Sequence, residues 1–190
     1  MKKQTAKKKA APKSKKSARK VPTAAKARVP AIPRGFRSVT PQLTVIGAAA
    51  AIDFYKKALG ARELMRMAGP DGKVMHAELK IGDSVVFLGD EFPEAGSKSP
   101  QTLGGASGSL HVYVPNVDAA FKRAVDAGAQ ATMPVTDMFW GDRYGKVKDP
   151  FGHEWGLATH KEDLSPAQMR KRGEEAMRQM AQRPPAQHGG

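Results

Sequence analysis

The sequence contains no cysteine, and this absence excludes disulfides, thiol nucleophiles and thiolate metal sites. It also has no apolar run that approaches the roughly 20 residues needed to cross a bilayer. Acidic residues are absent from residues 1–34, which carry 13 of the 32 Lys and Arg. Because residues 35–190 hold 19 basic and 18 acidic residues, almost all of the net charge of +14 belongs to the first segment. The basic character therefore does not indicate a nucleic-acid-binding surface on the rest of the chain.

Residues 1–34 consist mainly of Lys, Ala, Ser and Pro, with almost no large apolar side chain. Such a segment cannot bury enough surface to offset its ordering entropy, so we expect a disordered basic tail. Two interpretations stay open: nonspecific, salt-sensitive contact with nucleic acid or another polyanion, or a solubilising or vestigial extension. No apolar stretch follows the charges as in an export signal, and the Lys- and Pro-rich run differs from Arg-rich transit peptides. We expect a cytoplasmic protein.

One pattern occurs twice in the chain. Residues 41–61 (PQLTVIGAAAAIDFYKKALGA) and residues 110–129 (LHVYVPNVDAAFKRAVDAGA) each predict a short strand, a turn and a helix that ends at a glycine. Each copy is followed by alternating apolar residues typical of strands. The sequence therefore predicts an α+β fold in which two tandem βαβββ modules, about 38–90 and 108–160, form a cupped mixed sheet with helices on its outer face. A cup made of two similar halves places a ligand site between them.

Three helices are predicted, over about 49–59, 118–127 and 166–182. We expect Asp118 to cap the second, and Ser165 followed by Pro166 to begin the third. The third helix has a narrow apolar stripe that suits packing against the sheet or a twin subunit, or else recognition of a partner; it comprises Met169, Gly173, Ala176, Met177 and Met180. The expected domains are the tail (1–34), the two-module domain (35–164) and a C-terminal helix and tail (165–190).

The two faces of the sheet follow from one hairpin. Gly82-Asp83 is a two-residue turn signal, and pairing across it sets Leu79 beside Val86 and Glu78 beside Phe87. Period-two alternation extends this pattern to the other strands. The residues expected beneath the helices are Leu43, Val45, Leu79, Ile81, Val86, Leu88, Leu110, Val112, Val114, Trp155 and Leu157. Those expected to face the cavity are Thr40, Gln42, Thr44, His76, Glu78, Lys80, Val85, Phe87, Ser109, His111, Tyr113, Glu154 and Gly156.

The ordered set of segments IDFYKKALGA, PDGKVMHAEL, GDSVVFLGDE, VDAAFKRAVDAGA and DRYGKVKDPFGHEWGLATH resembles the glyoxalase/bleomycin-resistance/extradiol-dioxygenase superfamily, also called vicinal oxygen chelate proteins. It is most similar to the phosphonate-operon or demethylubiquinone-methyltransferase-like branch. The resemblance covers about residues 36–164. It implies a cup of two βαβββ modules, commonly in a homodimer, that binds a small molecule inside.

The resemblance also implies where a metal would lie, because metal-using members take one ligand from the first and last strand of each module. The corresponding residues are Thr40, Phe87, Ser109 and Gly156, none of which is a good ligand for a divalent ion. We therefore expect no metal at the usual position. One step along the strands, a displaced set has the right chemistry for Zn, Ni, Fe or Mn; it comprises Gln42, His76 or Glu78, His111 and Glu154. The alternative is that these residues form a hydrogen-bonded polar pocket, with His76 and Glu78 paired.

Another segment surrounds two charges with aromatic residues. Phe139, Trp140 and Tyr144 flank Asp142 and Arg143, close to the cavity mouth that the resemblance implies. They predict either an aromatic wall with Arg143 for an anionic or planar ligand, or an Asp142–Arg143 pair that fixes the loop. In the second case Trp140 covers the core.

Two classes of function are compatible with these residues. The first is a binder of small molecules that needs no cofactor; its expected pocket is formed by Gln42, His76, Phe87, Tyr113, Trp140, Arg143 and Glu154. The second is a lyase, isomerase or dioxygenase-type enzyme that uses a metal at the displaced set. Its catalytic candidates are Glu78, or else Glu154, as general base and His111, or else His76, as acid or electrophile.

Overall fold

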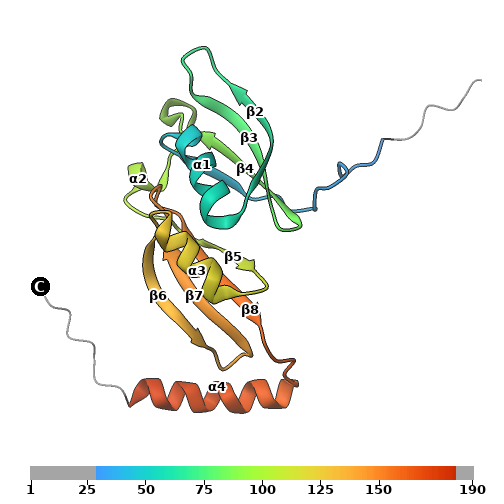
Figure 1. Cartoon of the computed structure of the whole chain (residues 1–190), viewed down its shortest axis with the longest axis vertical. Coiled ribbons are helices and arrows are strands. Elements are labelled where there is room, and N and C mark those ends of the chain that lie inside the picture. Colours follow the sequence, from blue (N-terminus) through green and yellow to red (C-terminus); the bar gives the residue numbers. More distant parts are fainter. Residues whose placement is uncertain (1–28, 183–190) are drawn as a thin grey trace, which may run out of the picture. The chain divides into compact units, whose positions relative to one another are not determined.

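The structure is a computed structural model that describes residues 29–182 (Figure 1). Most of the predicted basic tail, residues 1–28, lies outside the described residues, as do residues 183–190. The first module runs through five elements: β1 (Gln42–Val45), α1 (Ala48–Leu59), β2 (Arg62–Ala68), β3 (Val74–Ile81) and β4 (Ser84–Asp90). They form a four-stranded sheet in the order β1-β4-β3-β2, in which only the β1–β4 pair is parallel.

The second module repeats this arrangement after a linker that holds η1 (Pro93–Ala95) and α2 (Pro100–Leu103). Its elements are β5 (Ser109–Tyr113), α3 (Val117–Asp126), β6 (Gln130–Asp137), β7 (Asp142–Lys148) and β8 (Glu154–His160). The strand order is β5-β8-β7-β6, again with one parallel pair. The predicted α+β fold with two tandem βαβββ modules is therefore confirmed. Within residues 29–182 the strands form two open four-stranded sheets, and no ladder joins one sheet to the other.

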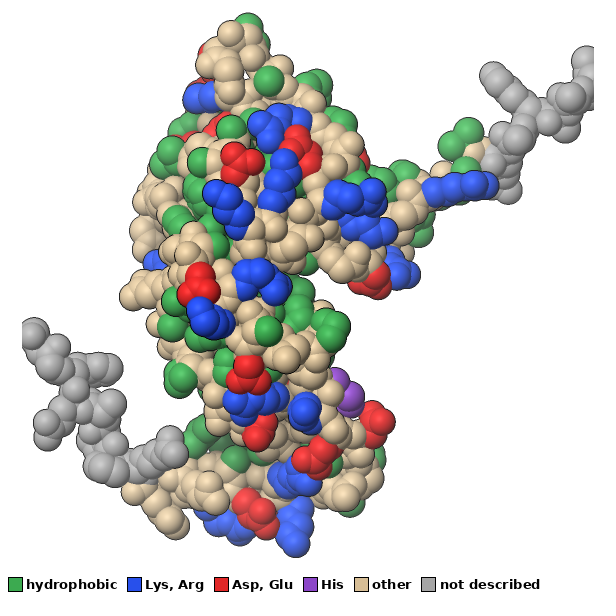
Figure 2. All heavy atoms as spheres, viewed as in Figure 1, with side chains coloured by type: hydrophobic (Ala, Val, Ile, Leu, Met, Phe, Trp, Pro, Cys, Tyr) green, Lys and Arg blue, Asp and Glu red, His purple; other side chains and the backbone are tan. Residues whose placement is uncertain are grey.

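The predicted hairpin and the two faces of each sheet are also observed. Leu79 pairs with Val86 and Glu78 pairs with Phe87 across the Gly82-Asp83 turn. The predicted helix-side residues Leu79, Val86 and Trp155 are buried, because α1 and α3 cover that face of their sheets. The prediction is wrong for Leu110, Val112 and Val114, which are only half-buried because no helix packs against β5. The opposite face of each sheet, called here the open face, carries mostly half-buried and exposed side chains, although Val85 and Asp142 on it are buried. On the face shown in Figure 2, Lys and Arg lie among Asp and Glu, as expected of a nearly neutral domain.

Helix α3 begins earlier than predicted. Its N-cap is Asn116, whose side-chain oxygen accepts a hydrogen bond from the N–H of Ala119 at 3.0 Å. The predicted cap, Asp118, is wrong: it lies in the first turn, where its carboxylate binds Arg143. Helix α1 has no capping side chain of its own, and the N–H groups of Gly47 and Ala48 instead donate to Asp90 at the end of β4.

Helix α4 (Pro166–Ala181) begins with the predicted Ser165-Pro166 signal, reinforced by a capping box between Ser165 and Gln168. None of its residues is fully buried, and Met177 and Met180 are exposed. Gly173 of this helix lies beside Phe139, in the loop before β7. Arg172 forms an ion pair with Glu162. The predicted packing of its apolar stripe on a twin subunit stays a prediction.

The two modules meet at one buried carboxylate. The hydroxyl of Tyr55, on α1, donates to Asp149 Oδ2 at 2.7 Å, and the indole N–H of Trp155, on β8, donates to the same oxygen at 2.8 Å. The backbone N–H groups of Phe151 and His153 donate to Asp149 Oδ1. All four donors serve a side chain that is almost completely buried. Burial and the neighbouring Asp149 carboxylate hold the pKa of Tyr55 well above its ordinary value, so its hydroxyl keeps its proton.

Further contacts between the modules surround this carboxylate. The ring of Tyr55 packs against those of Phe151 and Trp155, with centroids 6.2 and 5.3 Å apart. Arg123 Nε donates to the carbonyl oxygen of Ala58 at 3.1 Å.

Among the described residues, no helix has both the length and the apolar composition required to span a membrane.

The substitution Tyr55→Phe tests how much this contact contributes. It removes one of the four donors to a buried carboxylate while keeping the ring, so we expect the free energy of unfolding in urea to fall by about 1.5–3 kcal/mol. Tyr144→Phe is the matched control, because residues 29–182 provide no hydrogen-bond partner for the Tyr144 hydroxyl; its effect should stay within about 0.5 kcal/mol. Equal effects of the two variants would contradict a role of Asp149 in joining the modules.

Candidate functional site

Four rings gather on the open face of the second module. The imidazole of His111, on β5, stacks on the ring of Tyr144, on β7, with centroids 5.3 Å apart and planes only 10° apart. Tyr113 lies 4.7 Å from His111, and Trp140 lies 5.8 Å from Tyr144, between centroids. We call these four residues the aromatic cluster. His111, Tyr113 and Tyr144 come together because β5, β8 and β7 are neighbours in the sheet, and residues two apart on a strand share a face. Trp140 comes from the turn before β7.

A single carboxylate orients two of these rings. The side chain of Asp142 is 4% exposed, and its Oδ2 accepts from the Tyr113 hydroxyl at 3.0 Å and from the Trp140 indole N–H at 3.1 Å. Its Oδ1 lies 2.7 Å from His160 Nδ1. Burial alone would raise the pKa of Asp142, but the hydrogen bonds from His160, Tyr113 and Trp140 outweigh burial and lower it. Asp142 therefore stays ionised and holds the rings in place.

Arg143 lies on the other side of the sheet. Its guanidinium donates to Asp118 at 2.7 and 2.8 Å and to Asp137 at 3.2 Å, and these hydrogen bonds raise its pKa further. The predicted Asp142–Arg143 pair is wrong, because successive residues of a strand point to opposite faces. Sequence reasoning missed the role of Asp142. One signal could have indicated this role: Asp142 and Tyr144 are two residues apart on β7, so their side chains share a face of the sheet.

Tyr144 occupies the space above Gly156. A Cβ atom at position 156 would lie 2.7 Å from the Tyr144 hydroxyl oxygen, so a side chain there would have to displace the Tyr144 ring. In the sheet, His111 is the direct neighbour of Gly156, and Ser109 is the neighbour of Glu154. The Glu154 carboxylate accepts from Lys146 Nζ at 2.7 Å, and this hydrogen bond lowers the pKa of Glu154.

The open face of the first module holds a smaller group. The ring of Phe87 lies between Phe36, at 5.9 Å, and His76, at 4.8 Å between centroids. His76 Nε2 is 3.7 Å from Glu78 Oε1, which is the pairing expected of alternate residues on one strand. Gln42 pairs with Phe87 in the sheet and is exposed.

The predicted site residues thus fall into two groups. One comprises Gln42, His76, Glu78 and Phe87, and the other comprises His111, Tyr113, Trp140 and Glu154. Within residues 29–182 no hydrogen bond, ion pair or ring contact joins the first group to the second.

The residues at the implied metal positions do not fit a divalent ion. Phe87 and Gly156 supply no donor atom, and the Tyr144 ring covers the place where a side chain at 156 would project. The displaced candidates are divided between the two sheets, and Glu154 is bound to Lys146. Across the described residues, no group of three or more His, Asp or Glu side chains is arranged to hold a metal ion.

Comparison with known proteins agrees with this architecture. The family model "Glyoxalase/Bleomycin resistance protein/Dioxygenase superfamily" matches residues 37–157. The chain belongs to this superfamily. The branch within it stays a prediction.

Individual relatives cover the same part of the chain. The uncharacterized protein Rv0887c of Mycobacterium tuberculosis is 50% identical over 123 residues, which make up 63% of this chain and 72% of the relative. The crystal structure of TioX from Micromonospora sp. ML1 matches at 30% identity with a TM-score of 0.51, and covers 64% of this chain and 96% of that chain. The structure of an Arabidopsis thaliana gene product, AT5G48480, matches at 30% identity with a TM-score of 0.53, and covers 65% and 98%.

The pH dependence of His160 tests the polar support of the cluster. Hydrogen bonds to Asp142 and Asp163 raise the pKa of His160 above its ordinary value of about 6.5. A raised pKa means that protonated His160 stabilises the fold at pH values below about 6.5, and that this contribution is lost as the pH rises through the folded-state pKa.

We expect an NMR titration of the imidazole to give a midpoint above 6.5, and Asp163→Asn to lower it. The stability difference between the wild type and His160→Gln should be largest below pH 6.5 and should shrink at higher pH. A His160 midpoint below 6.5 would contradict this arrangement.

Proposed function

We propose that this domain binds a planar aromatic small molecule at the aromatic cluster, without a metal ion. The observation that carries the proposal is the replacement of a ligand-bearing position by Gly156, with the Tyr144 ring lying over it and stacked on His111. In superfamily members this face lines the cup that holds the ligand, and here it presents ring faces where metal donors would be needed.

The exposure and chemistry of the rings support a planar ligand. Tyr113 is 62% exposed although its hydroxyl is fixed by Asp142, so its ring offers a rigid surface that loses little entropy on binding. The parallel His111 and Tyr144 planes define the direction in which a further ring would stack. The Lys146–Glu154 pair on the same face supplies polar groups for the edge of such a molecule.

The second candidate is an enzyme that uses a metal at the displaced set. The 3.7 Å approach of His76 to Glu78 favours it, because an imidazole beside a carboxylate suits acid–base chemistry. In that case Glu78 or Glu154 would act as general base, and His111 or His76 as acid or electrophile. The predicted homodimer and the predicted polyanion contacts of residues 1–34 stay predictions from the sequence.

Binding at the aromatic cluster can be followed by fluorescence. The chain has two tryptophans, of which Trp140 belongs to the cluster and Trp155 is buried in the core. We expect some members of a panel of bicyclic and tricyclic heteroaromatic compounds to quench Trp140. Tyr144→Ala should weaken their binding by up to about tenfold, because it removes a stacking surface, whereas Tyr144→Phe should bind like the wild type. Unchanged affinity in Tyr144→Ala would contradict this site.

Elemental analysis of the untagged, purified chain separates the two candidates. Because Phe87 and Gly156 donate nothing and Glu154 is bound to Lys146, we expect no stoichiometric Zn, Ni, Fe or Mn. Stoichiometric metal that is lost in both His111→Ala and Glu154→Gln would replace the binder with the enzyme. Metal that survives both changes would mean that neither arrangement is correct.

A further inference from the structure

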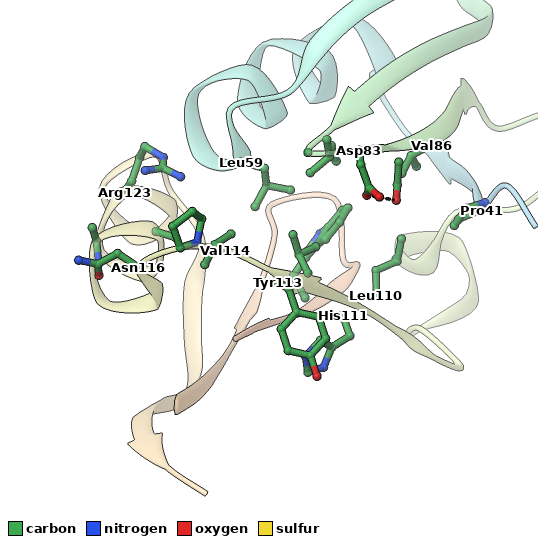
Figure 3. A pocket seen from close by; sticks show the side chains of 18 of the residues that line it. Pro41, Leu59, Asp83, Val86, Leu110, His111, Tyr113, Val114, Asn116 and Arg123 are labelled. Carbon is green, nitrogen blue, oxygen red and sulfur yellow. Dashed lines mark hydrogen bonds between the residues drawn. The ribbon is translucent and has the colours of Figure 1, made fainter. Parts of the chain in front are cut away.

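A cavity of about 860 Å³ lies beside β5, on the side of the strand away from the aromatic cluster (Figure 3). Its walls are mostly apolar and come from both modules; they include Leu59, Ile81, Val86, Leu110, Val112 and Trp155. In Figure 3 the labelled rings of Tyr113 and His111 project from β5 away from Leu59 and Val86. Figure 2 shows the surface hollowed between the two modules. His111 and Tyr113 therefore border the cavity, while their rings project to the other side of β5.

The cavity exists because β5 receives no helix. Helix α3 packs against β6, β7 and β8, while Val112 and Leu110 on β5 stay half-buried with their side chains turned toward the cavity. Apolar side chains in such a position gain free energy when an apolar molecule removes them from water. A volume of this size lies within the usual range for small-molecule sites.

Polar groups gather at one end of the cavity, and they are donors. Arg123 Nε is fixed by the carbonyl oxygen of Ala58, and within residues 29–182 its two terminal nitrogens have no hydrogen-bond partner. Asn116 uses its side-chain oxygen to cap α3, which leaves its amide N–H groups to donate. Figure 3 shows these two residues at one end, with Pro41 at the other.

Asp83 also borders the cavity, but its carboxylate does not repel an anion bound at the Arg123 end. Asp83 accepts hydrogen bonds from Arg37 at 2.9 Å and from the Ser84 hydroxyl at 2.9 Å, so its charge is balanced by Arg37. It lies with Val86, apart from Arg123, in Figure 3.

We propose that this cavity binds an amphiphilic carboxylate, with its hydrocarbon body along β5 and its carboxylate on Arg123 and Asn116. A guanidinium held by its Nε still presents two N–H donors, which match the two oxygens of a carboxylate. The apolar walls accept the hydrocarbon. Two residues of the aromatic cluster, His111 and Tyr113, also border this cavity, but neither provides the apolar walls or the donors that the proposal uses.

Dodecanoate and dodecanol, titrated calorimetrically into the full chain, test the proposal. We expect both to bind, and Arg123→Gln to weaken dodecanoate binding about tenfold or more while leaving dodecanol unchanged. Lys122→Gln is the matched control, since it removes the same charge from the neighbouring position of α3, where Lys122 pairs with Asp126 outside the cavity. Arg123→Lys keeps the charge and should fall between the wild type and Arg123→Gln.

Three outcomes would overturn the proposal. The first is the absence of dodecanoate binding to the wild type. The second is an equal effect of Arg123→Gln and Lys122→Gln, which would mean general attraction to a basic chain. The third is dodecanoate affinity that falls as the protein concentration rises, because a second copy of the chain would then fill the cavity. Tyr144→Ala should leave dodecanoate binding unchanged, so a failure at this cavity is distinguishable from a failure at the aromatic cluster.

Discussion

The buried carboxylate of Asp149 is the constraint on which the arrangement of the two modules depends. It sits in the turn before β8 and accepts hydrogen bonds from Tyr55 of the first module and Trp155 of the second. A buried carboxylate is tolerated only when donors surround it, and here two side chains and two backbone N–H groups do so. Moving the first module away would remove the Tyr55 hydroxyl, the one of these four donors that comes from that module, and would open the buried carboxylate to water. The cavity beside β5 has walls from both modules and therefore depends on the same contact.

A second buried carboxylate, Asp142, holds the aromatic cluster together by accepting hydrogen bonds from it. Asp142 holds Tyr113 and Trp140 by their polar atoms, so the two rings are fixed at their edges. His160 completes the support and makes it sensitive to pH in the neutral range. The cluster is thus a prepared surface, and a ligand that stacks on it would not have to pay for ordering these side chains.

Gly156 stands at one of the positions where the resemblance to the superfamily implies a metal ligand, and the Tyr144 ring lies over it. A glycine on β8 creates room above the sheet, and a tyrosine from β7 fills that room. The Tyr144 ring then stacks on His111, which is the direct neighbour of Gly156 in the sheet. A glycine at this position therefore supplies no donor atom, and the neighbouring strand places a ring face over it.

The sequence by itself determined the modules, the hairpin and the two faces of each sheet. The repeat, the Gly82-Asp83 turn and the alternation of Glu78, Leu79, Val86 and Phe87 act over a few residues, so they can be read locally. Only the tertiary structure decided which polar groups meet. The Tyr55–Asp149 bond joins residues 94 positions apart, and the Asp142–Tyr113 bond joins residues 29 apart. Such pairs depend on how sheets and helices pack, because hydrogen-bond partners at this separation leave no periodic pattern in the chain.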